Sequence, residues 1–550
     1  MESSKVMDRY RLVKTDVLVI GAGLAGLNAA YEAAKLGSSV TVLSKGAPAA
    51  SPEVMGFSAP IHPDDSPDLF YEDMMKSGGW INRDVLVRRL CSYSLEQIHR
   101  MENLGLIFAR NADGSYNGMR ALGNTYPRIA HYKALTGVES MKILRREADS
   151  LGVQFYANTR VLELLSDGKG VFGCLALDEN DTPLVFQSAC TVLATGGLSN
   201  MHPVSTYPKG LIGDGYALAM RAGAEMVDME FAQYEPCCIV YPESLSGKLI
   251  VTTMLNEGGK LLNVHGKEFL LRNEKGYKLQ KSELSRAIVE EIRRGGGTEH
   301  GGIWMDVTAL PYNRVVIDNS IFYNPPKQAG IDITKVPIEV APAAHTFLGG
   351  VRINEYCETS LEGLLAAGEV TGGVHGANRL GGCAGAEVFV FGTIAGVQAH
   401  SYARTHGNAE RDARPALDRA LERTSTKKNG SSKATTADVS QILSVMKKSI
   451  ESGLGIYRSE TRLKKCLQEL NTLESEIEVL PIQNVHWRLN FENIILNARM
   501  QILASLERKE SRGCFAREDY PEQNDNMWRK NIILKMCDGQ IQIKTRESSL

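Results

Sequence analysis

One arginine of this sequence stands in a segment whose composition is that of a protein interior. Residues 375–392 read HGANRLGGCAGAEVFVFG, so Arg379 is surrounded mainly by glycine, alanine and apolar residues. A guanidinium buried without a counter-charge is strongly destabilising, because it loses its hydration without gaining an ion pair. We therefore expect Arg379 to face an anion that is present only some of the time.

A glycine-rich turn near the N-terminus predicts a dinucleotide-binding unit. The apolar run 16–20 has the length of a strand, and GAGLAG (21–26) leads from it into the helical stretch LNAAYEAAKLG. In such a unit Gly21 permits the tight turn, Gly23 lets a pyrophosphate approach the backbone, and Gly26 lets the helix pack on the strand. The N-terminus of the helix then faces the phosphates.

The second strand of this unit, SVTVLS (39–44), ends without the acidic residue that an NAD site uses for the ribose. Ser44 and Lys45 stand there instead, which favours FAD over NAD. Two further strands, in 191–197 (TVLATGG) and 363–376 (GLLAAGEVTGGVHG), also end in glycines. Three such strand ends could converge on one extended cofactor, and FAD is long enough to need them.

The overall composition is typical of a globular protein. The chain has 550 residues, of which 43% are hydrophobic and 23% charged, and this length suggests two to four domains. A net charge of −2 argues against nucleic-acid binding. We expect no transmembrane segment, because no apolar run reaches about 18–20 residues. The N-terminus shows no secretory signal, so a cytoplasmic location is expected. The ten cysteines form no CxxC, and no metal site is predicted.

The character of the chain changes twice after the first glycine-rich strands. Between about 236 and 340 the glycine-strand pattern stops, and the segment reads as a small α+β insertion. Residues 424–440 are polar and of low complexity, which indicates an exposed loop. From 439 to about 508 apolar residues recur at helical spacing, and the end of the chain holds strand-like pieces such as GQIQIKT.

Several ordered motifs make the chain resemble the flavoprotein subunits of succinate dehydrogenases and fumarate reductases, and the L-aspartate oxidases. The resemblance runs from about residue 14 to about residue 530. Its motifs are GAGLAG (21–26), VLATGG (192–197), GDGYALAMRAGAEMVDMEF (213–231), EGGKLLNVHGKEF (257–269), HTFLGG (345–350), GLLAAGEVTGGVHGANRLGG (363–382) and ESRGCFAREDYPE (510–522).

The fold that the resemblance implies is α/β, with a Rossmann-like FAD-binding domain, an inserted α+β capping domain that is mobile, and a C-terminal helical domain. The corresponding ranges are 1–235 with 341–405 for the FAD-binding domain, 236–340 for the cap, 406–520 for the helical domain and 521–550 for a C-terminal tail.

The resemblance also implies the cofactor and its binding residues. Glu369 would hold the FAD ribose, and residues 384–388 would begin a helix aimed at the flavin. Residues 44–60 contain no histidine where succinate dehydrogenases tether their flavin, so we predict non-covalent FAD, as in L-aspartate oxidases. The predicted cofactor-binding residues are Gly21, Ala22, Gly23, Ala25, Gly26, Ser44, Lys45, Ala194, Thr195, Gly196, Gly197, Asp214, Gly368, Glu369, Arg379, Gly385 and Ala386.

The chemistry implied is a reversible hydride transfer between flavin N5 and one carbon of a C=C or C–C bond beside a carboxylate. An acid of the protein protonates the neighbouring carbon when the bond is reduced. Arg379 and His345 correspond to the family's carboxylate-binding Arg and His, and a guanidinium can bind a carboxylate through two hydrogen bonds. The intermittent anion beside Arg379 is then the substrate, a small carboxylate-bearing molecule.

The substrate site departs from the family at several positions. Glu235 replaces a carboxylate-binding His, and like charges close together are unfavourable unless Glu235 is protonated or turned away; it could also face solvent or a core arginine. Thr252 follows Val251 where the family has Thr-Glu, and it keeps a hydroxyl. The proton-donating Arg aligns with Lys281, while an offset alignment would give this role to Arg286. We therefore expect a substrate whose far end is neutral, hydrogen-bond donating or cationic, and not plain fumarate.

Other functions stay open. One is an amino-acid oxidase close to L-aspartate oxidase, and another is a flavoprotein similar to adenylylsulfate reductase that works with an iron–sulfur protein. A flavin-binding subunit without chemistry of its own is a third. Because the chain has no nicotinamide fingerprint of its own, its electrons must come through another protein, such as an iron–sulfur or other electron-transfer protein, a free reductant or a quinone.

Overall fold

The structure is a computed structural model, and it describes most of the chain. The described residues are 11–48, 50–133, 135–207, 209–407, 414–424, 435–480, 482 and 484–548. The central part of the predicted loop 424–440 lies outside these ranges. In the described part of the chain, every helix is too short or too polar to span a lipid bilayer.

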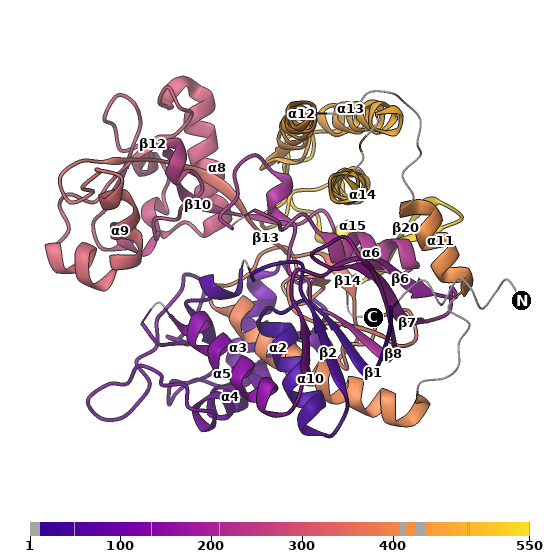
Figure 1. Ribbon diagram of the computed structural model, residues 1–550. Coiled ribbons are helices and arrows are strands. Elements are labelled where there is room, and N and C mark those ends of the chain that lie inside the picture. The colour runs from indigo at the N-terminus through magenta and orange to yellow at the C-terminus, as the bar shows by residue number, and fades with distance from the viewer. Residues whose placement is uncertain are drawn as a thin grey trace, which may run out of the picture.

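The predicted strand–turn–helix–strand unit is confirmed at the centre of the largest sheet. It consists of β1 (Arg11–Ile20), α2 (Leu24–Lys35) and β2 (Val40–Leu43). Strand β8 (Pro183–Leu193) runs parallel to β1 on its other side, and β15 (Leu364–Ala366) runs parallel to β8. The sheet has the order β5-β2-β1-β8-β7-β6, with β15 beside β8. Because β1, β8 and β15 run parallel, the three glycine-terminated strands end at the same edge of the sheet. Figure 1 labels β1 and β8 side by side.

Helices cover this sheet, and one of them comes very close to α2. Helix α10 (Cys383–His406) begins where the sequence predicted a flavin-facing helix. A Cβ on its Gly392 would lie 2.8 Å from the Ala25 carbonyl oxygen, and one on Gly396 would lie 2.4 Å from that of Ala29. Only glycine allows this contact between the two helices. The other elements of this region are β3 (Gly56–Ser58), α3 (Pro67–Ser77), α4 (Asp84–Asn103), β4 (Ile129–His131), α5 (Thr136–Ser150), β5 (Gln154–Tyr156), β6 (Arg160–Ser166), β7 (Val171–Leu177) and α6 (Asp214–Ala222).

The inserted segment forms a second sheet with its own apolar core. Its antiparallel strands have the order β10-β13-β12-β11, and the core lies among residues 237–340. Two long strands, β10 (Ala232–Tyr241) and β13 (Ile338–Phe347), connect it to the rest of the molecule, and it stands to one side in Figure 1. The remaining elements are α7 (Thr253–Asn256), β11 (Lys260–Leu262), α8 (Lys281–Glu291), β12 (Ile303–Asp306) and α9 (Ser320–Gln328).

The C-terminal part holds the predicted helices and a hairpin. The helices are α11 (Arg414–Thr424), α12 (Thr436–Leu454), α13 (Glu460–Val479), α14 (Val485–Glu507) and α15 (Asp525–Trp528), and two short strands, β17 (Tyr457–Arg458) and β18 (Ala516–Arg517), pair with each other.

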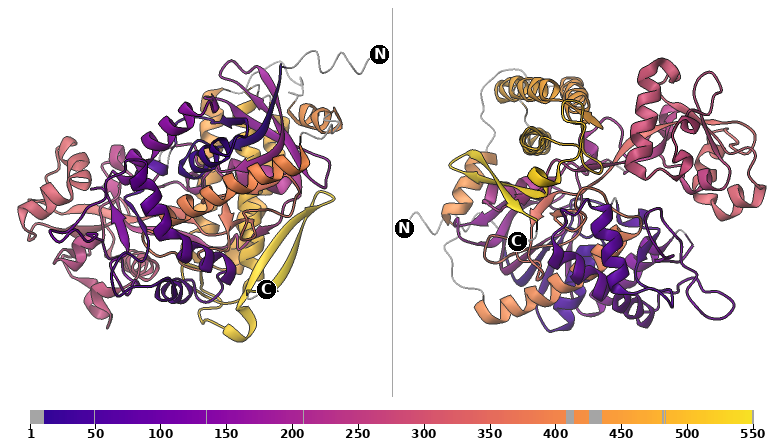
Figure 2. Two further views of the ribbon diagram at one scale, coloured as in Figure 1. Left: turned by 90° about the horizontal axis from the view of Figure 1, so that it is seen from below. Right: turned by 180° about the vertical axis from the view of Figure 1, so that it is seen from behind.

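The last two strands, β19 (Lys530–Cys537) and β20 (Gln540–Glu547), are drawn in yellow in Figure 2. Strand β19 pairs with β9 (Met226–Val227), which extends a sheet that also contains β14 (Gly350–Arg352) and β16 (Thr371–Gly372). Beside this junction the buried Arg508 bonds Glu230 at 2.6 Å and Glu510 at 3.0 Å. The predicted tail is thus joined to the FAD-binding region by backbone pairing and a buried charge cluster.

Candidate functional site

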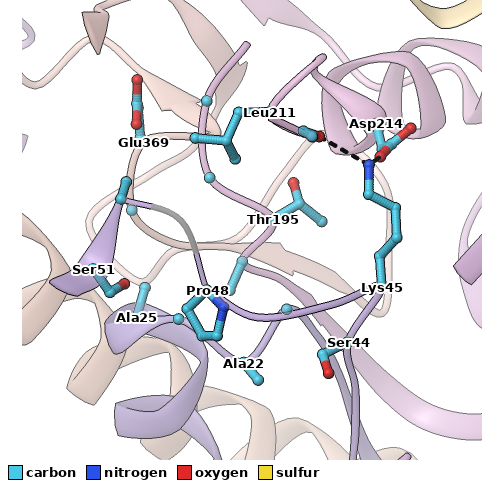
Figure 3. A pocket seen from close by; sticks show the side chains of 18 of the residues that line it. Ala22, Ala25, Ser44, Lys45, Pro48, Ser51, Thr195, Leu211, Asp214 and Glu369 are labelled. Carbon is cyan, nitrogen blue, oxygen red and sulfur yellow. Dashed lines mark hydrogen bonds and ion pairs between the residues drawn. The ribbon is translucent and has the colours of Figure 1, made fainter. Parts of the chain in front are cut away.

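A cavity of about 520 Å³ lies at the carboxyl ends of β1, β2, β8 and β15. Figure 3 shows that its walls come from segments far apart in the sequence. Most of the residues predicted to bind the cofactor line it, namely Gly21, Ala22, Gly23, Ala25, Ser44, Lys45, Ala194, Thr195, Gly196, Gly197, Asp214, Gly368 and Glu369.

The glycines of GAGLAG are required by close backbone contacts. Gly21 has φ of 116°, and a Cβ there would lie 2.1 Å from the Ala194 carbonyl oxygen. A Cβ on Gly26 would lie 1.9 Å from the Gly21 carbonyl oxygen, so Gly26 packs the turn and does not line the cavity. Sequence reasoning missed Ser51, whose Oγ accepts a hydrogen bond from the Leu24 N–H at the start of α2. This helix N-terminus opens into the cavity and suits a pyrophosphate.

Lys45 bridges the mouth of the cavity. Its Nζ lies 2.9 Å from the Gly210 carbonyl oxygen and 2.5 Å from Asp214 Oδ2, as the dashed lines of Figure 3 mark. Arg160 and Asn493 donate hydrogen bonds to Asp214 Oδ1 at 2.8 and 2.7 Å. Burial alone would raise the pKa of Asp214, but Arg160 and Lys45 hold it below its ordinary range. Because Asn493 belongs to α14, this cluster links the cavity to the helical region.

Glu369 and Thr195 supply polar groups inside the cavity. Burial raises the pKa of Glu369 to about 7, although the Phe347 N–H donates to its carboxylate at 3.1 Å and Arg379 lies near. Thr195 Oγ1 is buried and has no hydrogen-bond partner in the described part of the chain. These groups fit FAD, which carries ribose hydroxyls and a polar ring edge. Three further residues predicted to bind the cofactor, Arg379, Gly385 and Ala386, are not among the residues that line this cavity, and the last two belong to α10.

Arg379 is a buried cation that has no anionic partner among the described residues. Its side chain has two long contacts, 3.4 Å to the Leu380 carbonyl oxygen and 3.5 Å to Thr346 Oγ1. Its Nε makes no hydrogen bond, and none of the carboxylates in the described ranges forms an ion pair with it. The residue is only 8% exposed. In the described part of the chain Arg379 is thus buried with only these two weak hydrogen-bond partners.

His345 lies beside Arg379 and is held as a neutral imidazole. Its Nδ1 is 2.8 Å from Thr206 Oγ1, and its ring stacks on Tyr207 with centroids 5.2 Å apart. Burial lowers the pKa of His345 well below its ordinary value, and the charges of Arg379 and Lys281 lower it further. Sequence reasoning missed Thr206 and Tyr207, which belong to no motif.

Glu235 is paired with Lys281. Glu235 Oε2 lies 2.5 Å from Lys281 Nζ, and the Glu235 side chain is 2% exposed against 33% for Lys281. The carboxylate therefore faces neither solvent nor a core arginine, which were the alternatives open from the sequence. Strand β10 positions Glu235, and the first residue of α8 is Lys281.

The other two predicted residues lie differently. Arg286 donates a hydrogen bond to the Gly513 carbonyl oxygen at 2.7 Å. The charges that act on His345 are those of Arg379 and Lys281. Thr252 precedes α7, and its hydroxyl forms no hydrogen bond within the described ranges. Of the two proton-donor candidates, the structure brings Lys281 and not Arg286 to His345 and Glu235.

The comparisons with known proteins agree with this geometry. A family model described as an FAD binding domain matches residues 16–384, and one described as a fumarate reductase flavoprotein C-terminal region matches residues 444–549. The chain belongs to the fumarate reductase and succinate dehydrogenase flavoprotein family. This flavoprotein is an FAD-dependent oxidoreductase, and FAD is its cofactor.

Two relatives and two solved structures are similar to this chain over most of its length. A fumarate reductase (CoM/CoB) of Methanothermobacter marburgensis is 34% identical, and the match covers 95% of this chain and 97% of the relative. The chloroplastic L-aspartate oxidase of Oryza sativa is 29% identical, and the match covers 94% of this chain and 83% of the relative. E. coli quinol fumarate reductase matches with a TM-score of 0.90 at 26% identity, covering 98% and 97%. An adenylylsulfate reductase from Archaeoglobus fulgidus, at 20% identity and a TM-score of 0.76, covering 98% and 97%, shares the fold.

Proposed function

We propose that this flavoprotein transfers a hydride between its FAD and a C=C or C–C bond beside a carboxylate, and that one end of the substrate is held by Arg379 and His345. The observation that carries the proposal is the unpaired, buried guanidinium of Arg379. Burial of such a group without an ion pair is costly, so an anion that binds beside it gains a strong interaction. A substrate carboxylate does so through a bidentate contact.

The end of the site that is formed by Arg379 and His345 polarises the substrate. When FAD is bound, its N5 supplies or accepts the hydride. The Arg379 guanidinium and the neutral His345 ring then stabilise negative charge that develops on the substrate carboxylate, in a site from which most water is excluded. Thr206 fixes the orientation of the His345 ring through its hydroxyl.

Lys281 is the proton donor of this proposal. Its ammonium can give a proton to the carbon next to the one that receives the hydride. Glu235 holds the ammonium in place, and the partly exposed Lys281 side chain can regain its proton from solvent. Arg286 is assigned no catalytic role, because its guanidinium bonds the Gly513 carbonyl.

The charges of the site favour a substrate with a single carboxylate. Among the four side chains at the substrate end, Arg379 and Lys281 contribute two positive charges, Glu235 one negative charge and the neutral His345 none, which leaves one positive charge. Glu369, whose pKa burial raises to about 7, is counted with the FAD cavity that it lines. One carboxylate neutralises it, whereas the second carboxylate of fumarate would stand uncompensated near Glu235. We therefore propose an acid whose far end is neutral and donates hydrogen bonds, such as an amide or an alcohol.

The remaining parts of the proposal concern the cofactor and the partner. The FAD is bound without a covalent link, since none of the described residues that line the cavity is a histidine. All ten cysteines are free thiols and nine are buried, which suits the reducing cytoplasm. Electrons come from or go to an iron–sulfur or other electron-transfer protein.

The test is a substrate screen with dithionite-reduced holoenzyme under anaerobic conditions. We expect the monoamide of fumaric acid to reoxidise the flavin and fumarate to do so much more slowly. Failure of every unsaturated acid would contradict the proposal. Hydrogen peroxide formed from L-aspartate in air would instead indicate an amino-acid oxidase.

A further inference from the structure

A hydrogen bond between the FAD-binding region and the cap joins the residue that precedes Arg379 to the residue that precedes Lys281. Asn378 Nδ2 donates to Gln280 Oε1 at 3.1 Å. Asn378 directly precedes Arg379 in the FAD-binding region, and Gln280 directly precedes Lys281 at the start of α8 in the cap. The two residues are 98 positions apart in the sequence, so the packing of the inserted segment against the FAD-binding region brings them together.

Asn378 is fixed firmly on its own side of this bond. It is 5% exposed, and its Nδ2 also donates to Ser77 Oγ at 3.1 Å. Its Oδ1 accepts a hydrogen bond from Gln233 Nε2 at 3.0 Å, and the same Nε2 donates to the Arg379 carbonyl oxygen at 3.0 Å. The position of the Asn378 amide is therefore tied to the backbone that carries the Arg379 guanidinium.

Gln280 is fixed on the cap side by the start of α8. Its backbone N–H donates to Glu283 Oε2 at 2.9 Å, an interaction typical of a capping box. Any shift of Gln280 moves Lys281, because Lys281 is the first residue of the helix. Two contacts fix where α8 begins. Lys281 bonds Glu235 on β10, and Gln280 accepts a hydrogen bond from Asn378 of the FAD-binding region.

We propose that Gln280 is a positioning residue, and that its bond to Asn378 sets Lys281 at the correct distance from a substrate held by Arg379. The inference rests on the proposed role of Lys281 as proton donor. Hydride and proton must reach neighbouring carbons of one bound molecule, and an error of about 1 Å in such an arrangement can cost about a hundredfold in rate. The Gln280–Asn378 bond also makes correct closure of the cap a condition for proton delivery.

The test compares two variants at position 280. Gln280→Met keeps the length of the side chain but removes the acceptor, whereas Gln280→Glu keeps an acceptor for Asn378. With the monoamide of fumaric acid we expect Gln280→Met to lower kcat about thirtyfold, within the range that misplacement produces, while KM changes little. Its solvent deuterium isotope effect should increase, because proton transfer becomes slower. Gln280→Glu should recover most of the rate.

Two controls separate positioning from general damage. Reoxidation of the reduced flavin by oxygen does not use Lys281 and should be unchanged in Gln280→Met. Gln154→Met, which removes a glutamine on β5 whose amide bonds the Gly152 carbonyl, should behave as wild type. Wild-type kcat and isotope effect in Gln280→Met would overturn the inference.

Failure of the proposed function would give a different result. In that case wild-type enzyme turns over no unsaturated acid, and amide hydrogen exchange of holoenzyme decides the inference. Faster exchange of the hydrogen-bonded amides of residues 284–291 in Gln280→Met, but not in Gln154→Met, would support the Asn378–Gln280 bond as the contact that sets α8. Equal exchange in all three proteins would overturn it.

Discussion

Arg379 and Lys281 are the two cationic side chains of the proposed substrate site, and the fold surrounds them differently. Arg379 is buried in the FAD-binding region, and none of the described carboxylates pairs with it. Lys281 is one-third exposed at the edge of the cap and is paired with Glu235 at 2.5 Å. A buried cation without an ion-pair partner is stabilised when an external anion binds to it, whereas a cation that already pairs with a carboxylate needs no such anion. The comparison therefore assigns the single carboxylate of the substrate to Arg379.

The largest expected effect follows from removing the unpaired cation. Arg379→Gln should lower kcat/KM about a thousandfold, because the groups that stabilise developing charge often contribute this much. The measurement is anaerobic flavin reoxidation by the monoamide of fumaric acid. An unchanged flavin spectrum serves as the control for folding and FAD content. A loss of less than tenfold would mean that Arg379 does not hold the substrate carboxylate.

The paired cation should matter less, and through a different step. Lys281→Met should reduce kcat about a hundredfold, as expected for the loss of a general acid. Arg286→Met is the matched variant on the same helix and should stay within threefold of wild type. Stopped-flow reduction and reoxidation would measure both. The reverse pattern would return the proton-donor role to Arg286.

The charge difference between the two ends also predicts selectivity. Glu235→Gln leaves the Lys281 charge uncompensated, so the far end gains one positive charge. A unit charge at about 8 Å with an effective dielectric constant of about 20 is worth about 2 kcal/mol, so the ratio of kcat/KM for fumarate to that for its monoamide should rise about thirtyfold. Competition assays with both acids give this ratio. The control is Glu274→Gln, at an exposed position of the cap, which should leave this ratio unchanged. An unchanged ratio in Glu235→Gln as well would mean that Glu235 lies outside the site.

A smaller effect concerns the binding of FAD at Glu369, which lies near Arg379. The pKa of Glu369 is raised to about 7 by burial, and ribose hydroxyls donate better to the ionised form. Binding then releases a proton, so FAD affinity of the apoprotein should rise about tenfold between pH 6 and 8. Glu369→Gln should remove this dependence, as followed by quenching of FAD fluorescence. A flat profile in wild type would exclude Glu369 as a ribose ligand.

The cofactor site was more predictable from sequence than the substrate site. The constraints on GAGLAG come from the turn and from the strand beside it. A Cβ on Gly26 would meet the Gly21 carbonyl oxygen, whereas Gly21 has φ of 116° and lies against the Ala194 carbonyl oxygen just after β8. The convergence of three strand ends follows from parallel pairing in one sheet. For these reasons the FAD cavity could be placed from the motifs alone.

The pairing of charges in the substrate site depends on how the cap packs. Glu235 and Lys281 lie 46 residues apart, and they meet only because α8 packs beside β10. The alignment gave Lys281 and Arg286 as alternatives, and only the three-dimensional direction of each side chain separated them. Gln233 and Tyr207 were missed because their roles come from tertiary contacts and not from a spacing in the sequence.

In the proposed site, the one uncompensated positive charge of Arg379 binds the one carboxylate of the substrate. The direct test is a titration of the oxidised wild-type flavoprotein with succinate and with its monoamide, followed by the change in flavin absorbance. We expect the monoamide to bind at least about tenfold more tightly, and Arg379→Gln to abolish the binding of both. Tighter binding of succinate than of the monoamide, or binding that survives in Arg379→Gln, would contradict the account.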